Sequence, residues 1–428
     1  MDANLWYKPR HYLHFDKPIS LKKASSIVTS STRVSSHSFY PFLAYEILSK
    51  KIIKDPVIGI TRKEKIRPIS FASHVDAHIY SYYCQLLTIP YEAELNRLKL
   101  SSNVIAFRKL GKSNIDFAND AFSFIKNKGG CTAICYDISG FFNNLDHDLL
   151  KEKWAKMLQK ENLPKDHYSV YKSITKFSTV NRSDLYKNLG ISTTNPKDKD
   201  GRICSPSEFR NRIRAANLIK PNPNKNLRGQ LIGIPQGSPI SAFLSNLYMI
   251  DFDHAVAEAV EEIGGMYCRY CDDMLFVIPT EWKVHIGDFV RKEIKKLNID
   301  INPDKTEVRD FEKDGGRLRA DKPLQYLGFL FDGQSCYIRS SSLARYSERM
   351  KRGVNLAKLT KIKHNRIRAS RGLPLERLYK RKLYNKYSHL GNRNFVRYGL
   401  RAAQIMGSKT IKRQLKPLWN RLNERIKK

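Results

Sequence analysis

Residues 266–278 read Met-Tyr-Cys-Arg-Tyr-Cys-Asp-Asp-Met-Leu-Phe-Val-Ile, and this stretch decides the fold. Apolar and aromatic residues flank the polar tip Tyr270-Cys271-Asp272-Asp273, a pattern that predicts a β-hairpin turning at the acidic pair. Two adjacent carboxylates in an apolar segment are costly to bury without a positive partner. A hard divalent cation, usually Mg²⁺ held by carboxylates and substrate phosphates, is the partner such a tip favours. A solvated Asp-Asp turn is the alternative for this segment alone.

Composition narrows the class of partner. The 428 residues suffice for two or three domains with a substantial core, and they carry 77 Lys and Arg against 41 Asp and Glu, a formal net charge of +36. Such an excess favours a polyanion, and nucleic acid fits better than a membrane. No apolar run is long enough to span a bilayer and the N-terminus lacks a signal-peptide core, so we expect no membrane partner and a cytoplasmic location. Seven cysteines without a repeating framework suit a reducing compartment.

The C-terminal segment concentrates the positive charge. Residues 341–428 contain 26 Lys and Arg against three acids, with helical periodicity and interleaved aromatic residues. A helical surface of this kind follows a phosphate backbone and makes binding depend strongly on salt. A merely solvated basic bundle is the weaker interpretation.

Two further stretches carry candidate site residues. Cys131–Asp137 reads as a buried strand that ends in an acid, and an acid at a strand end is well placed to face a cleft. A metal shared with Asp272 and Asp273 is the obvious partner for Asp137. In Leu231–Ile250, the tight turn Pro235-Gln236-Gly237-Ser238-Pro239 precedes an apolar helix, and Gly237 lets a ligand approach the backbone.

The remaining pattern alternates helices and strands. Val57–Ser70 predicts a hairpin with a basic turn at Arg62, Lys63 and Lys65 and with Arg67 just beyond it, able to close over an anionic substrate, although an ordinary solvated turn is the alternative. Residues 176–230 read as a polar insertion with little core of its own. Periodicity predicts helices at 74–87, 115–128, 146–158 and 281–297, a strand at 299–308 with Lys305 after its turn, and a hairpin at 324–331.

The order of these features is informative. Asp137, the Pro-Gln-Gly turn and the Tyr-Cys-Asp-Asp tip follow one another, and two carboxylate sources supporting two Mg²⁺ ions are what in-line phosphoryl transfer needs. The combination resembles the palm of reverse transcriptases, over about Val57 to Phe331. The resemblance implies an α+β right-hand polymerase with an N-terminal extension (1–50), fingers (51–130), a palm (131–335, with a fingers-side insertion at 176–230) and an α-helical basic thumb and C-terminal region (336–428).

The resemblance also assigns roles. It implies that Asp137, Asp272 and Asp273 bind the two Mg²⁺ ions and that Lys305 protonates the leaving pyrophosphate. Substrate contacts follow at the remaining matched positions: Arg67 and Lys65 at the triphosphate, Phe142 as the gate that excludes a ribose 2′-hydroxyl, Gln236 and Gly237 beneath the templating pair, Tyr270 beside the acids, and Leu327–Phe329 as the primer grip.

Other segments point to a subgroup. His11–Asp16 (HYLHFD), His37–Phe42 (HSFYPF) and the unbroken basic helical C-terminus resemble bacterial defence-associated reverse transcriptases. The size and the Tyr-Cys-Asp-Asp tip are most similar to those of the type-two class. That class implies an RNA template, namely a neighbouring noncoding RNA, which is copied from dNTPs into repetitive cDNA during anti-phage defence. A retron-type enzyme making RNA-linked cDNA, an Abi-like protein-primed and template-free polymerase, and a non-catalytic RNA-binding scaffold are the alternatives.

One pattern competes with the acidic tip. Cys268 and Cys271 have zinc-ligand spacing, and Cys131 and Cys135 are expected on a neighbouring strand. Strand alternation works against placing all four thiols on one side, so we expect small buried thiols instead.

Overall fold

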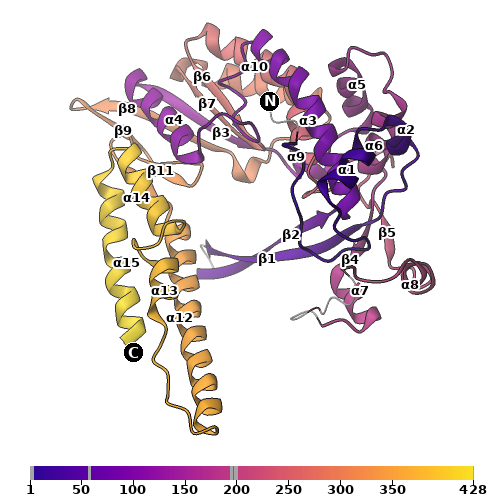
Figure 1. Cartoon of the computed structure of the whole chain (residues 1–428). Helices are drawn as coiled ribbons and strands as arrows, with labels where there is room; N and C mark the ends of the chain where they lie inside the picture. Colours follow the sequence, from indigo (N-terminus) through magenta and orange to yellow (C-terminus); the bar gives the residue numbers. More distant parts are fainter. Residues whose placement is uncertain (1–3, 56–58, 193–195, 197–200, 428) are drawn as a thin grey trace.

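The computed structural model describes residues 4–55, 59–192, 196 and 201–427. A central sheet with covering helices lies between a helix-rich N-terminal region and a long helical C-terminal region (Figure 1). The expected α+β class with a helical C-terminal region is confirmed.

The central sheet carries the acidic tip. Its strand order is β6-β7-β3-β8-β9, with every neighbouring pair antiparallel. The strands are β3 (Cys131–Asp137), β6 (Met266–Tyr270), β7 (Asp273–Ile278), β8 (Glu307–Asp314) and β9 (Arg317–Ala320). The hairpin predicted at 266–278 and the strand predicted at 131–137 are therefore confirmed.

Both faces of this sheet are buried, which explains the unbroken apolar run of β7. Met274, Phe276 and Ile278 belong to one core cluster, whereas Leu275 and Val277 belong to the other. The first cluster includes residues of α10 (Ile250–Glu262) and α11 (Lys283–Lys295), and the second includes residues of α4 (Asn114–Lys128). Because alternate side chains point to opposite faces, a strand covered on both sides has no polar positions in its pattern.

The fingers contain a second sheet, of order β2-β1-β4-β5. Its strands are β1 (Phe42–Asp55), β2 (Gly59–Phe71), β4 (Ser178–Asn181) and β5 (Ile219–Pro221). The helices of this region are α1 (Leu21–Val28), α2 (Ser31–Ser35), α3 (His74–Arg97), α5 (His147–Met157), α6 (Lys165–Thr175), α7 (Arg182–Leu189) and the short α8 (Pro206–Glu208). In Figure 1 the β1–β2 ribbon extends from the fingers toward the C-terminal helices.

Two expectations for the fingers are wrong. Arg62, Lys63 and Lys65 do not form a turn: they lie within β2, opposite Ile52, Lys51 and Ser49 of β1. The three basic residues suggested a turn because they interrupt a more apolar pattern. The β1–β2 ribbon projects from the fingers (Figure 1), however, and a projecting ribbon accommodates charged side chains within its strands.

The insertion at 176–230 is also better ordered than expected. Its residues Val180, Leu185, Ile203, Phe209 and Ile213 form a small core together with residues from β1 and the N-terminal extension. Strands β4 and β5 extend the fingers sheet, and β4 runs parallel to β1. The insertion supplies seven of the nine buried residues of this cluster, and Phe15 and Leu43 supply the other two, so the insertion has a core of its own.

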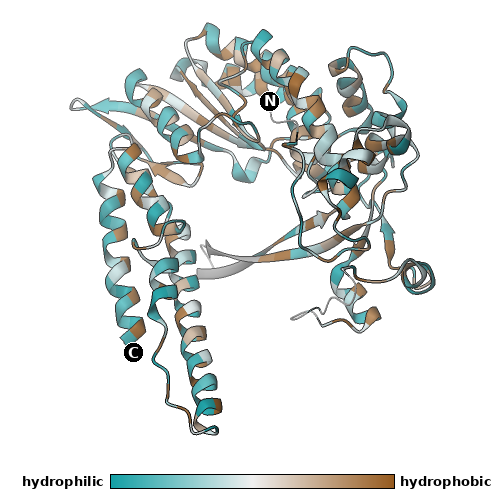
Figure 2. Cartoon of the chain, viewed as in Figure 1, coloured by the Kyte–Doolittle hydropathy of each residue, from teal (hydrophilic) through white to brown (hydrophobic). Residues whose placement is uncertain are grey.

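The C-terminal region is a helical thumb on a small sheet. The sheet is made of β10 (Leu324–Tyr326), β11 (Phe329–Phe331) and β12 (Cys336–Ile338), so the hairpin predicted at 324–331 is confirmed. The helices are α12 (Ser340–Ala369), α13 (Lys380–Tyr387), α14 (Phe395–Ile405) and α15 (Lys409–Lys427). Their buried residues share one core cluster with β7, β8 and α4, which fixes the thumb to the palm. Figure 2 shows hydrophilic residues predominating along the thumb helices.

None of the helices in the described ranges has the length and apolar character that crossing a bilayer requires.

Candidate active site

The acidic residues meet at the end of two neighbouring strands. Asp137 ends β3 and lies directly opposite Asp273, the first residue of β7. Directly opposed residues of an antiparallel pair have Cβ atoms about 4.5–5.5 Å apart and share a face. Asp272 precedes them in the turn, where its carbonyl accepts the Ile138 N–H at 3.3 Å. The register therefore brings Asp137 and Asp273 together, and the backbone fixes Asp272 beside them.

The turn itself is tight. Tyr270 pairs with Asp273, so only Cys271 and Asp272 connect β6 to β7. Cys271 has a φ of 62°, in the left-handed region that side chains other than glycine rarely adopt. Its side chain is buried, which anchors the turn on the core while the two carboxylates that follow it face outward.

Lys305 reaches the same place from a third segment. Its ammonium group donates to Oδ2 of Asp137. Two backbone bonds hold this segment on the end of β3: the Asn302 N–H donates to the Asp137 carbonyl at 2.7 Å, and the Ser139 N–H donates to the Asp300 carbonyl at 2.8 Å. The expected strand at 299–308 is wrong in its first half, because Pro303–Lys305 forms a 3-10 turn and β8 begins only at Glu307.

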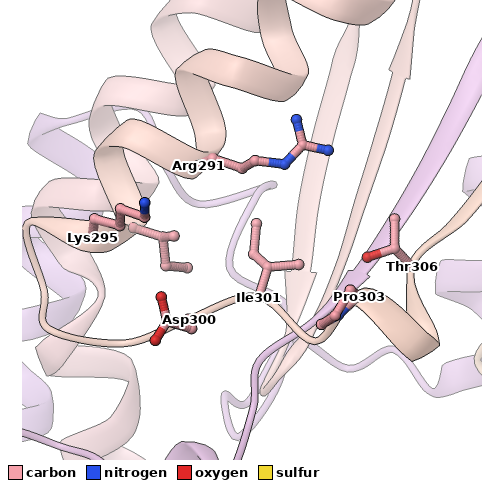
Figure 3. A pocket seen from close by; sticks show the side chains of 7 residues that line it. Arg291, Lys295, Asp300, Ile301, Pro303 and Thr306 are labelled. Carbon is pink, nitrogen blue, oxygen red and sulfur yellow. The ribbon is translucent and has the colours of Figure 1, made fainter.

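The outer side of this segment borders a cavity of about 390 Å³. Arg291 and Lys295 of α11 line it together with Asp300, Ile301, Pro303 and Thr306 (Figure 3). The loop that carries Lys305 is therefore supported from β3 and open on its other side.

The donor set fits a hard divalent cation. Carboxylate oxygens are the ligands that Mg²⁺ prefers, and the Lys305 ammonium already supplies a positive charge to Asp137. Within the part of the chain that the structure describes, no group of three His, Cys, Asp or Glu side chains is arranged to hold a metal ion. Binding of two ions by Asp137, Asp272 and Asp273 stays a prediction.

The thiols around the tip behave as core residues. The Cys268 Sγ lies 3.2 Å from the hydroxyl of Tyr326, and burial raises the pKa of Cys268 to about 11. Burial also raises the pKa of Cys131 to about 11 and raises that of Cys135 and Cys271. A raised pKa keeps a thiol protonated, whereas zinc binds the thiolate.

Backbone hydrogen bonds join the segment around Phe142 to the segment that leads into the Pro-Gln-Gly turn, and we call these two segments the active-site layer. The Ile234 N–H donates to the Phe142 carbonyl at 2.8 Å, and the Gly233 N–H donates to the Leu145 carbonyl at 2.7 Å. A Cβ on Gly233, whose φ is 78°, would lie 2.4 Å from the Asn143 carbonyl oxygen, so only glycine fits. The segment that carries Phe142 and the segment that leads to Gln236 are therefore held as one unit.

The same turn contacts the fingers. The Ser70 N–H at the end of β2 donates to the Gln236 carbonyl at 2.8 Å. Gly237 has a φ of 114°, and a Cβ there would lie 2.7 Å from the Ser70 carbonyl oxygen. Arg67 lies three residues earlier on β2 and is exposed. The structure therefore places Arg67 on the strand that leads to Gln236 and Gly237, whereas the side chain of Lys65 lies outside the described residues.

The Leu327–Phe329 segment joins palm and thumb. Leu327 and Gly328 have φ values of 43° and 92° and connect β10 to β11. Asn114 at the start of α4 donates from Nδ2 to the Leu327 carbonyl at 3.1 Å. The hairpin expected to grip the primer is thus tied to the palm by its backbone.

Arg269 supports the acidic tip from the protein interior, and its role was not predicted from the sequence. Arg269 and Asp253 are both fully buried, and their side chains meet through Nε–Oδ1 and Nη2–Oδ2 contacts of 2.7 and 2.5 Å. The Arg269 Nη1 donates to the Cys271 carbonyl and to Asn246 Oδ1, each at 3.1 Å. Asp253 holds the pKa of Arg269 above its ordinary value against the opposing effect of burial. The sequence did contain a signal for this pair, because an arginine in an otherwise apolar strand is rarely buried without a counter-ion.

The fold is that of a polymerase palm, with carboxylates at two neighbouring strand ends, a lysine beside them and a glycine turn that contacts the fingers. Residues 53–331 match the model of the reverse transcriptase (RNA-dependent DNA polymerase) family. The match covers more than half of the chain, and the protein belongs to this family.

Solved telomerases are among the structures to which this chain is similar. The apo telomerase of Candida tropicalis, truncated from its C-terminal domain, matches with 11% identity and a TM-score of 0.41, covering 75% of this chain and 61% of its own. The Candida albicans telomerase in complex with a fragment of telomeric RNA matches with 11% identity and a TM-score of 0.39, covering 96% and 65%. This chain thus spans less than two thirds of either telomerase, and a likeness this remote carries no argument about its activity.

Proposed function

We propose that this chain is an RNA-directed DNA polymerase that copies an associated noncoding RNA into repetitive cDNA as part of antiviral defence in the bacterial cytoplasm. The observation that carries the polymerase activity is the register of β3 and β7, which sets Asp137 opposite Asp273 with Lys305 against Asp137. Carboxylates from separate segments at one strand end are what in-line nucleotidyl transfer requires.

The chemistry follows from the side chains at the site. Asp137, Asp272 and Asp273 would hold magnesium ions, which supply a lowered pKa at the primer 3′-hydroxyl and neutralise the pyrophosphate charge. Lys305 is half-exposed and bound to only one side of Asp137, so its ammonium can turn to the leaving pyrophosphate and give it a proton. Phe142 would stand against the sugar of the incoming nucleotide, on a backbone that Ile234 keeps in place.

The defence role rests on the N-terminal segments, which resemble those of bacterial defence-associated reverse transcriptases. Asp16 of HYLHFD accepts the N–H groups of His74 and Val75 at 2.8 Å, at the start of α3. Asp76 of α3 accepts from His37 at 2.7 Å and from the Tyr40 N–H at 2.9 Å, both in HSFYPF. Both segments are thus built into the fingers, which is consistent with a family-specific variant of the polymerase body.

The polymerase activity is tested with purified protein, its co-purifying RNA, Mg²⁺ and dNTPs. We expect cDNA from the wild type and none from the double variant Asp272→Ala/Asp273→Ala. The matched control is Asp288→Ala/Asp314→Ala, which removes two exposed carboxylates away from the site. Equal cDNA from the Asp272→Ala/Asp273→Ala variant would refute the site assignment.

The defence role needs a separate measurement. Bacteria carrying the gene with its flanking noncoding RNA should resist phage, and the Asp272→Ala/Asp273→Ala variant should restore plaque formation. Sequencing the cDNA should return tandem copies of the neighbouring RNA. Protection that survives the double variant, or cDNA copied from unrelated RNA, contradicts this part of the proposal.

A further inference from the structure

One apolar side chain is completely exposed beside the active-site layer. Leu227 has a relative exposure of 108%, the highest among the exposed large hydrophobic residues of the described chain. It lies in a loop of residues 225–231, which we call the Leu227 loop, closed by a bridge between Lys225 and Leu231. A leucine held fully in water on an ordered loop can bury its whole apolar surface when a partner covers it.

The Leu227 loop is preorganised. The Asn226 Oδ1 accepts the N–H groups of Arg228 and Gln230, each at 3.0 Å. The Asn226 N–H donates to the Gln230 carbonyl at 2.9 Å, and the Gly229 N–H donates to the Asn226 carbonyl at 2.9 Å. The backbone and side chain of Asn226 therefore hold the loop in one conformation, in which the Leu227 side chain is fully exposed to solvent.

The base of the loop is attached to the active-site layer. Asn222 Nδ2 donates to the Ile232 carbonyl at 2.9 Å, and the Ile232 N–H donates to the Asn224 carbonyl at 3.2 Å. The next residue, Gly233, is bonded to Leu145 and precedes Gln236 by three positions. Leu227 precedes Gln236 by nine positions, so the leucine lies within about 30 Å of that turn even for an extended chain.

The surroundings of the loop select an anionic partner. No acidic residue occurs between Glu208 and Asp251, whereas six cations do: Arg210, Arg212, Arg214, Lys220, Lys225 and Arg228. Arg228 follows the leucine directly and Lys225 precedes it by two positions, and both are exposed. An apolar side chain between two cations is the chemistry with which proteins part stacked bases while holding the adjacent phosphates.

We propose that Leu227 is a strand-separating wedge, which packs against the last base pair of an RNA duplex ahead of the copied nucleotide while Lys225 and Arg228 bind its phosphates. The proposal rests on the proposed polymerase function and adds to it a way to copy folded RNA. A single-stranded template needs no such wedge, so the two properties can be separated by experiment.

The first test compares two primed templates, one unstructured and one with a stable hairpin downstream. Leu227→Ala should lower read-through of the hairpin by about tenfold, the factor that 1.4 kcal/mol of lost contact represents at 25 °C, and should leave synthesis on the unstructured template unchanged. Leu227→Met, which keeps an apolar side chain of similar size, should restore read-through. Val284→Ala, at an exposed apolar residue of α11, is the control. Equal synthesis by Leu227→Ala on both templates, or an equal loss on both, overturns the wedge.

The second test needs no synthesis. A fluorescent base analogue is placed at the first paired position of a template fork, and protein is added without dNTPs. Wild-type protein should raise the fluorescence as that pair opens, and Leu227→Ala should raise it several-fold less at saturating protein. No opening by the wild type, or the same opening by both, overturns the proposal even if the polymerase is active. A protein partner that binds through Leu227 while both nucleic-acid measurements stay unchanged overturns it as well.

Discussion

Removing the carboxylate of Asp253 should destabilise the acidic tip more than any exposed ion-pair variant. Asp253 accepts two bonds from Arg269 and one, of 2.6 Å, from the Tyr267 hydroxyl, and neither Arg269 nor Asp253 is exposed to solvent. In Asp253→Ala the Arg269 charge keeps only Asn246 and the Cys271 carbonyl as partners. Leaving a buried charge without its counter-ion costs about 3–5 kcal/mol.

Hydrogen exchange of the peptide spanning residues 266–278 is the appropriate assay. It reads the opening free energy of β6 and β7 alone, whereas a single unfolding midpoint is ill-defined for a chain of several domains. The control is Glu94→Ala, which breaks the exposed Glu94–Arg97 pair and should cost less than about 1 kcal/mol. Equal protection in the two variants would refute the assigned role of the buried pair.

A double variant separates stability from positioning. Asp253→Leu/Arg269→Met replaces the pair with apolar side chains, and such replacements are often neutral or stabilising, so protection should largely return. Activity should not return, because the bond from Arg269 to the Cys271 carbonyl is lost and the turn that carries Asp272 is no longer held. Full activity in the stable double variant would show that Arg269 does not position the turn.

Three further outcomes are expected. Phe142→Ala should admit ribonucleotides, measured as the ratio of rNTP to dNTP incorporation, and an unchanged ratio would remove the gate assignment. Gly233→Ala should lower the local opening free energy, read from hydrogen exchange of the peptide that contains residue 233, by well over 1 kcal/mol, because its Cβ would collide with the Asn143 carbonyl. Gly316→Ala, with the same φ of 78° and nothing within 4 Å, should show in its own peptide only the strain of that φ. Burial lowers the pKa of His14 to about 3, so the open state binds a proton that the folded state does not; the opening free energy of the segment around His14 should fall as pH drops below about 6.5, and His14→Gln should flatten that slope in hydrogen exchange corrected for the intrinsic rate at each pH.

The acidic tip was predictable because its pattern is local. Strand β3 and the β6–β7 hairpin carry buried residues in succession and end in acids, and the structure places both as the periodicity indicates. Their register, which brings Asp137 opposite Asp273, was not in the pattern. It followed only from the expectation that carboxylates of one metal site must share a strand end.

Pairings across long intervals escaped prediction for a physical reason. Arg269 could be seen to need a counter-ion, but the sequence does not say which acid supplies it, and Asp253 lies on a helix whose amphipathic pattern places many acids outside. The basic segment of β2 was misread because charged residues usually mark turns, while its partner strand β1 contributes the pairing that keeps it extended. The local sequence pattern predicts whether a segment forms a helix or a strand, whereas the segment with which it pairs determines where that strand ends.

The backbone at the end of β3 makes three hydrogen bonds to segments that are distant in sequence. Asp137 gives its carbonyl to Asn302, Ile138 gives its N–H to the Asp272 carbonyl, and Ser139 gives its N–H to the Asp300 carbonyl. Three distant segments are thus joined by main-chain bonds that no side-chain substitution removes. The carboxylates that project from this framework do not supply these main-chain bonds, so replacing one by alanine should abolish synthesis without unfolding the palm. The turn before Asp272 is the exception, because a side chain, that of Arg269, holds it. A change at the buried Arg269–Asp253 pair, remote from substrate, can therefore move a carboxylate of the site.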